Sequence, residues 1–194
     1  MTPRTRLLVL GASAGGPAAL AKLLGNLPRE FPAAMIVVQH IDEEFSPLMA
    51  KWLGEQTKFP VRMAAPGDRP VPGTVLLAGT NDHLIFQADQ TLAYTPEPRA
   101  HAYRPSVDVF FESVARFWRG DVAAVVLTGM GRDGAKGLKA LRTAGAFTIA
   151  QDQATSAVYG MPKAAADLRA AEEILPLNDI APCLVRYFCG AACG

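Results

Sequence analysis

The sequence predicts a doubly wound α/β fold, in which a mostly parallel sheet lies between two layers of helices in a Rossmann-like, three-layer arrangement. Short apolar runs alternate with longer segments of helical periodicity, which is typical of a parallel sheet covered on both faces. Each run ends in a loop. A chain of 194 residues buries on the order of 70% of its unfolded surface, so one domain with a real core is expected.

The predicted strands are short and strongly apolar. Five are expected in the parallel sheet, at residues 7–10, 35–39, 75–78, 122–127 and 147–150. Residues 84–86 and 91–94 are separated by a four-residue connection, which favours an antiparallel hairpin near residues 84–94. The hairpin interrupts the parallel pattern.

The predicted helices carry start and stop signals. Ser46 and Pro47 supply an N-cap and a first-turn proline, and Ser106 caps a segment with one apolar, aromatic face. A helix over 135–144 is stopped by Gly145, and Met161 opens one that runs to about residue 171. Residues 95–105 contain three prolines and are predicted to form a surface loop.

Composition excludes several classes of protein. The net charge of +1 gives no basic field for nucleic acid. No stretch approaches the roughly 18 apolar residues of a membrane helix, so a cytoplasmic protein without membrane insertion is expected. Cys183, Cys189 and Cys193 crowd into the last dozen residues, where they favour neither a disulfide framework nor a zinc site. We expect no metal and no cofactor, and one domain over 1–194 with a tail from about 189.

The candidate chemistry lies in the loops that follow the strands, because ligands of open α/β sheets bind where the carboxyl ends of the strands meet. The first such loop places Ser13 in a G-x-S-x-G pattern, a sharp strand-to-helix turn that presents a hydroxyl. A glycine-rich loop here could equally bind a phosphate at a helix N-terminus. However, the pattern G-x-G-x-x-G needs glycine at position 13.

A serine nucleophile needs a base, and the chain has three histidines, His40, His83 and His101. His40 alone ends a buried strand, so it is the first candidate. A lone histidine there is more often structural, but the serine turn beside it favours catalysis. His83 also follows a strand and is the reserve candidate or a substrate contact. His101, in the irregular loop, is expected to be solvated.

The third candidate is Asp133, which follows the fourth strand and precedes a helix whose N-terminus favours a carboxylate. A simple helix N-cap is the alternative. Capping does not explain the glycines around it. Glycine loses more conformational entropy on folding than other residues, so several glycines together indicate a place where the backbone passes close to another group. Other acids near strand ends stay open as competitors: Asp42, Glu43, Glu44 and Asp82.

Five motifs together resemble the catalytic domain of the protein-glutamate methylesterase (CheB) family, in the family's order and over nearly the whole chain. They are Leu10–Pro17, Val38-Gln39-His40, Arg104–Asp108, Leu127–Ala135 and Gly160-Met161-Pro162. The resemblance implies a serine hydrolase that demethylates glutamate methyl esters on chemoreceptors, releases methanol, and in some members deamidates glutamine.

The resemblance also implies roles for residues of this chain. Ser13, His40 and Asp133 fall on the catalytic triad, and the N–H groups of Met130 and Ala14 on the oxyanion hole. His83 and Arg104 are expected to contact substrate. The implied partners are the methylated cytoplasmic helices of chemoreceptors, with a receiver domain or a signalling kinase complex.

Two features depart from the family pattern. Ala14 replaces a common threonine, so a hydroxyl beside Ser13 is missing although the backbone N–H remains. Residues 78–83 resemble the subgroup that serves chemosensory-like pathways other than flagellar chemotaxis. The family usually also carries an N-terminal receiver domain, which is not among these 194 residues. The alternatives from other classes are an inactive docking module for receptor helices and a phosphate-binding protein.

Overall fold

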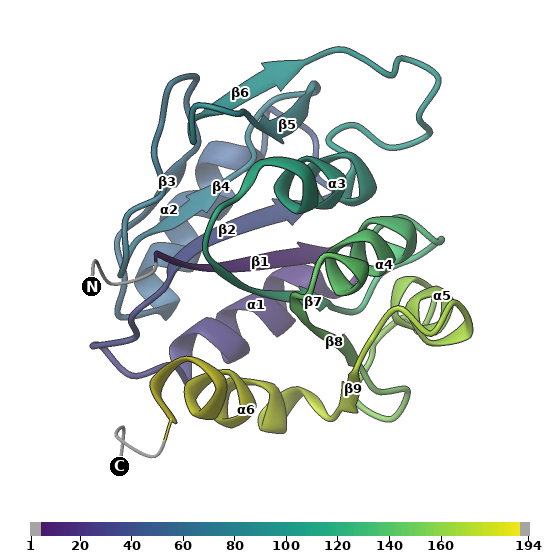
Figure 1. Ribbon diagram of the computed structural model, residues 1–194. Helices are drawn as coiled ribbons and strands as arrows, with labels where there is room; N and C mark the ends of the chain where they lie inside the picture. Colours follow the sequence, from purple (N-terminus) through teal and green to yellow (C-terminus); the bar gives the residue numbers. More distant parts are fainter. Residues whose placement is uncertain (1–4, 191–194) are drawn as a thin grey trace.

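A computed structural model describes residues 5–190 and shows the predicted α/β fold (Figure 1). Seven parallel strands form the main sheet in the order β3-β4-β2-β1-β7-β8-β9. Their bounds are β1 (Arg6–Ala12), β2 (Ala34–Gln39), β3 (Val61–Met63), β4 (Val75–Leu77), β7 (Asp121–Val126), β8 (Phe147–Gln151) and β9 (Glu173–Leu175).

Six helices cover the two faces of this sheet. They are α1 (Gly16–Gly25), α2 (Ser46–Gln56), α3 (Val107–Phe117), α4 (Ala135–Thr143), α5 (Met161–Asp167) and α6 (Leu177–Cys189). The buried side chains of α3, α4 and α5 pack on one face, and those of α1, α2 and α6 on the other. The layers are visible in Figure 1, where α1 and α6 lie on the opposite side of the sheet from α3 and α4.

Strand β1 shows why the sheet needs two layers. Leu7 and Val9 belong to the core under α3, whereas Leu8 and Leu10 belong to the core under α1. All four side chains are fully buried. Because successive side chains of a strand point to opposite faces, a strand that is apolar at every position must be covered twice.

The predicted hairpin is present and stands apart from the main sheet. Strands β5 (His83–Phe86) and β6 (Leu92–Thr95) pair antiparallel in a two-stranded sheet, with Leu84 opposite Tyr94. Leu84, Phe86 and Leu92 join the core beneath α3. The hairpin therefore extends that layer, and the loop after it leads back over the carboxyl end of the sheet.

Two helix boundaries differ from the prediction. Helix α2 begins at Ser46, but the Ser46 hydroxyl donates to the Asp42 carbonyl oxygen and caps no N–H group, so the predicted N-cap is wrong. Helix α5 ends at Asp167 and not near residue 171, because Arg169 adopts a left-handed conformation that breaks the helix. Cys193 and most of the predicted tail lie outside the described residues.

The chain changes direction across the sheet between β1 and β7. From β1 it runs outward through β2 to β4 and β3, and later returns to β7 on the other side of β1. Loops on the two sides of such a switch point leave an open crevice at the carboxyl ends of the strands. Ser13 follows β1, His40 follows β2, and the loop 128–134 follows β7. Across residues 5–190, no helix combines the length and apolar character that crossing a membrane requires.

Candidate functional site

Ser13 is held at the switch point by backbone hydrogen bonds to both sides. Its N–H donates to the Thr128 carbonyl oxygen at 3.0 Å, and its own carbonyl accepts from the Gly16 N–H at 2.8 Å. The turn is tight because Gly15 adopts a left-handed conformation with φ of 77°. The turn and the helix α1 that follows it are those expected of a G-x-S-x-G loop.

A close approach fixes the glycine at position 129. A Cβ added there would lie 2.8 Å from Ser13 Cβ and would also overlap the Met161 sulfur. Such a contact is too short for real side chains, so any residue with a Cβ would displace either Ser13 or the loop after β7. Glycine at position 129 therefore allows the backbone of this loop to pass close to Ser13.

Gln39 ties the serine turn to the histidine. Its amide nitrogen donates to the Ser13 carbonyl at 2.9 Å and to the His40 carbonyl at 3.1 Å. The His40 N–H in turn donates to the Ala12 carbonyl at 3.0 Å. Because Ala12 and Gln39 are register partners across β1 and β2, Ser13 and His40 emerge side by side. In the sequence, Gln39 could have been noticed as the polar residue of an otherwise apolar strand that was expected to be buried.

His40 is joined to Asp133 by a short hydrogen bond. Its Nε2 lies 2.7 Å from Asp133 Oδ2, and the two side chains are 9% and 2% exposed. Asp133 thus comes from the loop after β7 and meets a histidine from the loop after β2, on the far side of β1. The structure brings together the three residues that the sequence pattern singled out.

Asp133 accepts three further hydrogen bonds, all from the start of α3. The Ser106 hydroxyl and the Asp108 N–H donate to Oδ1 at 2.8 Å and 3.0 Å, and the Val107 N–H donates to Oδ2 at 2.7 Å. Burial alone would raise the pKa of Asp133. The hydrogen bonds from His40 and from the start of α3 outweigh it and hold the pKa below its usual value.

This arrangement corrects the alternative that Asp133 is the N-cap of the next helix. The N-cap of α4 is Gly134, with φ of 91° and no side-chain cap. The helix N-terminus that stabilises the carboxylate is that of α3, which lies 25 or more residues earlier in the chain. Sequence reasoning placed the carboxylate at the N-terminus of the wrong helix, since only the fold brings α3 to this loop.

The ionisation of Asp133 fixes the role of each His40 nitrogen. A carboxylate only accepts, so Nε2 carries the proton and donates it to Asp133. When the ring is neutral, Nδ1 is then the nitrogen that carries the lone pair. It is buried and has no hydrogen-bond partner within residues 5–190. An unpartnered acceptor beside the Ser13 turn is the group that can take a proton from a serine hydroxyl.

The backbone N–H groups near Ser13 that have no acceptor among the described residues include those of Ala14 and Met130. Ala14 directly follows the serine, and Met130 directly follows Gly129, the close neighbour of Ser13. Free N–H groups on two sides of a nucleophile can hold a developing oxyanion. The Met130 side chain is 63% exposed and does not cover this position.

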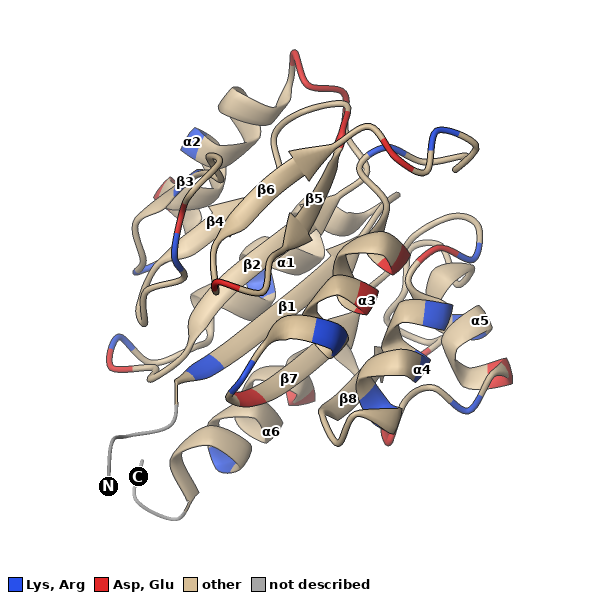
Figure 2. Cartoon of the chain, turned by 45° about the horizontal axis from the view of Figure 1, so that its top comes forward, with Lys and Arg blue, Asp and Glu red and all other residues tan. Residues whose placement is uncertain are grey.

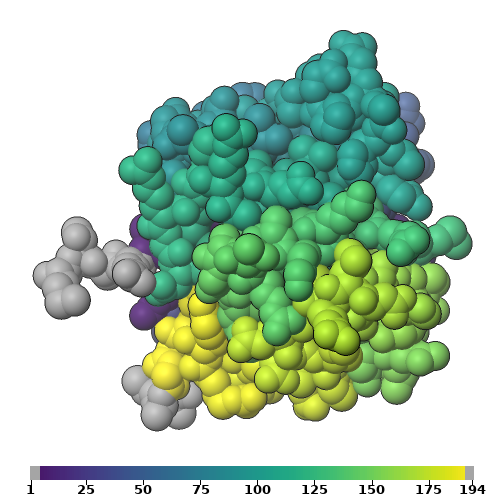
Figure 3. All heavy atoms as spheres, turned by 45° about the vertical axis from the view of Figure 1, so that its right-hand side comes forward, coloured from purple at the N-terminus to yellow at the C-terminus, as the bar shows by residue number. Residues whose placement is uncertain are grey.

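The loop 96–106 lies over His40. The Tyr103 ring stacks on the His40 ring with centroids 4.3 Å apart and planes 3° from parallel. Tyr103 stands between two clefts, one of about 300 Å³ that reaches His40 and one of about 650 Å³ beside Asp133. In the space-filling view the teal segment with this loop stands above the green surface of α4 (Figure 3). No sequence pattern pointed to Tyr103, which lies in the least regular part of the chain.

His83 cannot contact a substrate in this structure, because it has no exposed surface. Its Nδ1 accepts from the Ser106 N–H at 3.1 Å, so Nε2 carries the proton and donates to the Pro98 carbonyl at 3.2 Å. Burial lowers the pKa of His83 and keeps this neutral tautomer. His83 is therefore not the expected substrate contact, and instead its ring holds both ends of the loop 96–106.

Asp108 is a second buried carboxyl group next to the site. Its Oδ1 accepts from the Gly137 N–H at 2.7 Å and so joins α3 to α4. Burial raises the pKa of Asp108 to about 6, with a further contribution from the negative charge of Asp133. Before the structure, Asp108 stood out only as part of the Arg104–Asp108 motif.

The remaining expected residues lie at the edge of the site. Arg104 is exposed and lines the smaller cleft together with His40 and Tyr103, so it stays open to a substrate. The competing acids do not reach the ring of His40. Asp42 accepts from the Glu44 N–H, and Glu43 pairs with the backbone of Asn81.

A doubly wound sheet that presents a serine, a histidine and a buried carboxylate at neighbouring strand ends defines the architecture of a serine hydrolase. Comparison with protein families agrees. Residues 8–184 match the family described as CheB methylesterase, and the chain belongs to this family.

Curated relatives are closely similar over this chain. One from Cupriavidus pinatubonensis, called protein-glutamate methylesterase/protein-glutamine glutaminase 1, is 64% identical over 95% of the chain and 54% of its own length. Another, called protein-glutamate methylesterase/protein-glutamine glutaminase 3, from Pseudomonas aeruginosa, is 60% identical over 95% of the chain and 55% of its own length. The chain spans about half the length of the curated relatives it matches.

A solved structure supports the fold. The crystal structure of the CheB methylesterase catalytic domain from Thermotoga maritima is 32% identical and superposes with a TM-score of 0.89. It covers 96% of this chain, and this chain covers 100% of it. The parallel sheet, the helices and their connections are thus those of that catalytic domain.

Proposed function

We propose that the chain is a protein-glutamate methylesterase, which hydrolyses the γ-methyl ester of glutamate side chains on chemoreceptors. The observation that carries this proposal is the 2.7 Å hydrogen bond between His40 and the buried carboxylate of Asp133, while Gln39 ties the backbone of His40 to that of Ser13 and His40 Nδ1 has no partner among the described residues. Family membership supports the choice of ester, since the relatives carry this activity in their names.

The reaction proceeds by acyl transfer in two steps. Ser13 Oγ attacks the ester carbonyl while His40 Nδ1 takes the hydroxyl proton, and the same proton passes to the departing methoxide, which leaves as methanol. Water then attacks the acyl-enzyme, again through His40, and releases the glutamate. Asp133 keeps the ring in the productive tautomer and stabilises the imidazolium that forms in each step.

The N–H groups of Met130 and Ala14 are proposed to hold the oxyanion in both steps. A preorganised donor of this kind is worth about 3 kcal/mol of transition-state stabilisation. The missing hydroxyl at position 14 leaves this role intact because backbone supplies the donor. Arg104, at the mouth of the smaller cleft, is proposed to contact the receptor segment that carries the ester.

The test uses receptor membranes whose glutamates are methylated, with methanol release as the readout. Replacing Ser13 with alanine should remove activity by a factor on the order of 10⁶ in kcat while the protein stays folded. Activity of folded Ser13→Ala within tenfold of the parent would exclude Ser13 as the nucleophile. An inactive docking module or a phosphate-binding protein would release no methanol in the parent either.

Deamidation of receptor glutamine is a second activity that the same site can perform, and the relatives' names include protein-glutamine glutaminase. The acyl-enzyme is the same, and His40 gives its proton to the departing amide nitrogen, which leaves as ammonia in place of methanol. Ammonia release from a receptor with glutamine at the modified positions tests it. A cytoplasmic location and association with a receiver domain or a kinase complex stay predictions.

A further inference from the structure

The larger cleft takes no part in the proposed chemistry. It measures about 650 Å³ and lies between the loop 100–103 and the start of α4. Neither Ser13 nor His40 lines it, although Asp133 contributes to its wall. Tyr103 separates it from the cleft that reaches His40. A protein substrate with its ester on Ser13 would therefore extend into or past this cleft.

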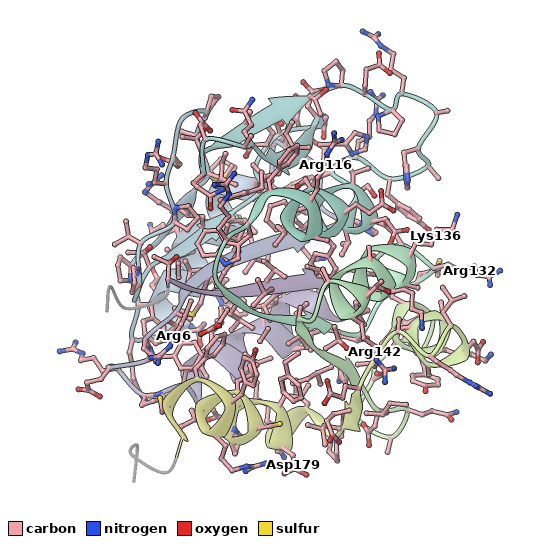
Figure 4. All side chains as sticks on the ribbon, in the orientation of Figure 1. Arg6, Arg116, Arg132, Lys136, Arg142 and Asp179 are labelled. Carbon is pink, nitrogen blue, oxygen red and sulfur yellow. The ribbon has the colours of Figure 1, made fainter. Side chains whose placement is uncertain are left out.

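The exposed charges at this cleft are both positive. Arg132, from the loop before α4, and Lys136, from its first turn, are exposed, and within residues 5–190 neither forms an ion pair. Figure 4 shows the two side chains on the same side of the molecule, extending outward from the carboxyl end of the sheet. The carboxylates of Asp108 and Asp133 are buried there and accept hydrogen bonds from backbone N–H groups.

The remaining lining is mostly apolar, with the His101 and Tyr103 rings as its other polar members. Leu168, which is 43% exposed, lies in this cleft together with Ala100, Ala102 and Ala135. Such a lining fits an amphipathic peptide segment better than a small free anion, because only a peptide covers apolar surface and brings a carboxylate at once.

The other side of the site carries an acidic run as well as the exposed Arg104. The acidic run of residues 42–44 is exposed and directly precedes α2, where Figure 2 shows a red segment at the end of that helix. An acidic partner segment is repelled there and attracted to the side of Arg132 and Lys136. Exposed charges are thus of both signs on that side, whereas those at the larger cleft, Arg132 and Lys136, are both positive.

From this geometry we propose that the cleft of Arg132 and Lys136 binds an acidic side chain of the protein substrate that flanks the methylated glutamate. The inference rests on the proposed esterase function and adds the sequence class that the enzyme prefers. Substrate segments with carboxylates near the ester should be demethylated faster than segments with amides in the same places.

The test compares three esters by methanol release. Two are synthetic helical peptides with one glutamate γ-methyl ester, identical except that the positions one turn away on either side carry glutamate or glutamine. The third is the γ-methyl ester of N-acetylglutamic acid α-amide. The parent should favour the acidic peptide by about tenfold in kcat/KM at low ionic strength, and by about twofold in 0.5 M salt, because exposed charges are screened.

Lys136→Glu should remove this preference without harming the fold, since an acidic residue in a first helical turn is favourable. Its kcat/KM should fall about tenfold on the acidic peptide and stay unchanged on the other two esters. Lys51→Glu, an exposed lysine on α2 with the same change in net charge, should alter none of them. Equal rates on both peptides in the parent, or the same loss in Lys51→Glu, would overturn the inference. A parent that cleaves none of the esters would instead refute the proposed function.

Discussion

The two carboxylate oxygens of Asp133 accept four hydrogen bonds in all. Oδ2 accepts from His40 Nε2 and from the Val107 N–H, and Oδ1 accepts from the Ser106 hydroxyl and the Asp108 N–H. Only a carboxylate accepts on both sides. Position 133 therefore requires a carboxylate with acceptors on both oxygens, which a helix cap would not require.

Asp133→Asn should lower kcat by about 10⁴, the loss known for the equivalent change in another serine hydrolase, because an amide donor facing Nε2 imposes the wrong tautomer on His40. It should also cost about 1–3 kcal/mol of unfolding free energy, since the amide leaves buried donors unpaired. Ester hydrolysis and urea denaturation of the same preparation measure both effects. Near-parental turnover would remove Asp133 from the triad.

Asp108 illustrates a carboxyl group whose charge opposes folding. Its pKa of about 6 lies above the usual 3.8, so the folded state binds the proton more tightly, and stability rises as the pH falls from 6 towards 4. Asp108→Asn should therefore raise the unfolding free energy by about 1–3 kcal/mol at pH 8 and by about half as much at pH 5. Denaturation at the two pH values tests this. A variant destabilised at pH 8 would mean that the bond to Gly137 needs the charge.

For individual residues of the site, sequence patterns pointed to those at strand ends but not to those that position them. Ser13, His40 and Asp133 stood out because each follows a predicted strand. Tyr103 and the second role of Ser106 did not, since both depend on the loop 96–106 returning across the sheet. Long-range contacts of this kind leave no local pattern in a single sequence.

The loop 96–106 is the element that completes the site. One end is fixed through Pro98 and the other through Ser106, both to the ring of His83, and Tyr103 in between covers His40. The hairpin β5–β6 supplies His83 and is anchored in the core under α3. The hairpin, which departs from the parallel pattern, thus supports the loop that covers His40, the proposed base.

Tyr103→Ala should reduce kcat by about twofold to tenfold, because a stacked aromatic pair is worth about 0.5–1.5 kcal/mol and its loss frees the His40 ring. Tyr103→Phe keeps the stacking and should retain parental turnover. Measuring kcat and KM of both variants on the small ester separates ring placement from receptor binding. An equal loss in the two variants would assign the effect to the phenolic hydroxyl instead.

His83→Gln should destabilise the protein by about 1–3 kcal/mol at pH 8, because glutamine cannot bridge Ser106 and Pro98 as the ring does. The pKa of His83 is lowered from 6.5, so its contribution is complete above that pH and is lost as the pH falls towards the lower value. The difference between parent and variant in urea denaturation should shrink below about pH 6.5. A constant difference would argue against the neutral tautomer.

Elements were predictable where local signals were strong. The β1, β2 and β7 strands are long apolar runs, and α4 ends before Gly145, which adopts a left-handed conformation. The edge strands β3 and β9 have three residues each and are only partly buried, so their sequences are not distinct from loops. Helix α6 contains Pro182, which argues against a helix in a single sequence.

The whole molecule is built as two halves that meet between β1 and β7. Ser13 and His40 belong to the half that precedes the hairpin, and Asp133 belongs to the half that follows it. The hydrogen bond from the Ser13 N–H to the Thr128 carbonyl joins them at the switch point. Fold class was predictable from the alternation of strands and helices, but the order of the strands was not, since it depends on pairings between distant segments.

That division also sets the order of events when the chain refolds. Ser13 and Thr128 are far apart in the sequence, and closing so long a loop is slow compared with forming a helix or a hairpin. Neither half holds Ser13, His40 and Asp133 together, so turnover by the proposed triad can return only after β1 and β7 have paired. Recovery of esterase activity after dilution from denaturant therefore cannot precede the pairing of β1 with β7, and the helical signal should regain its native value no later than the enzyme does.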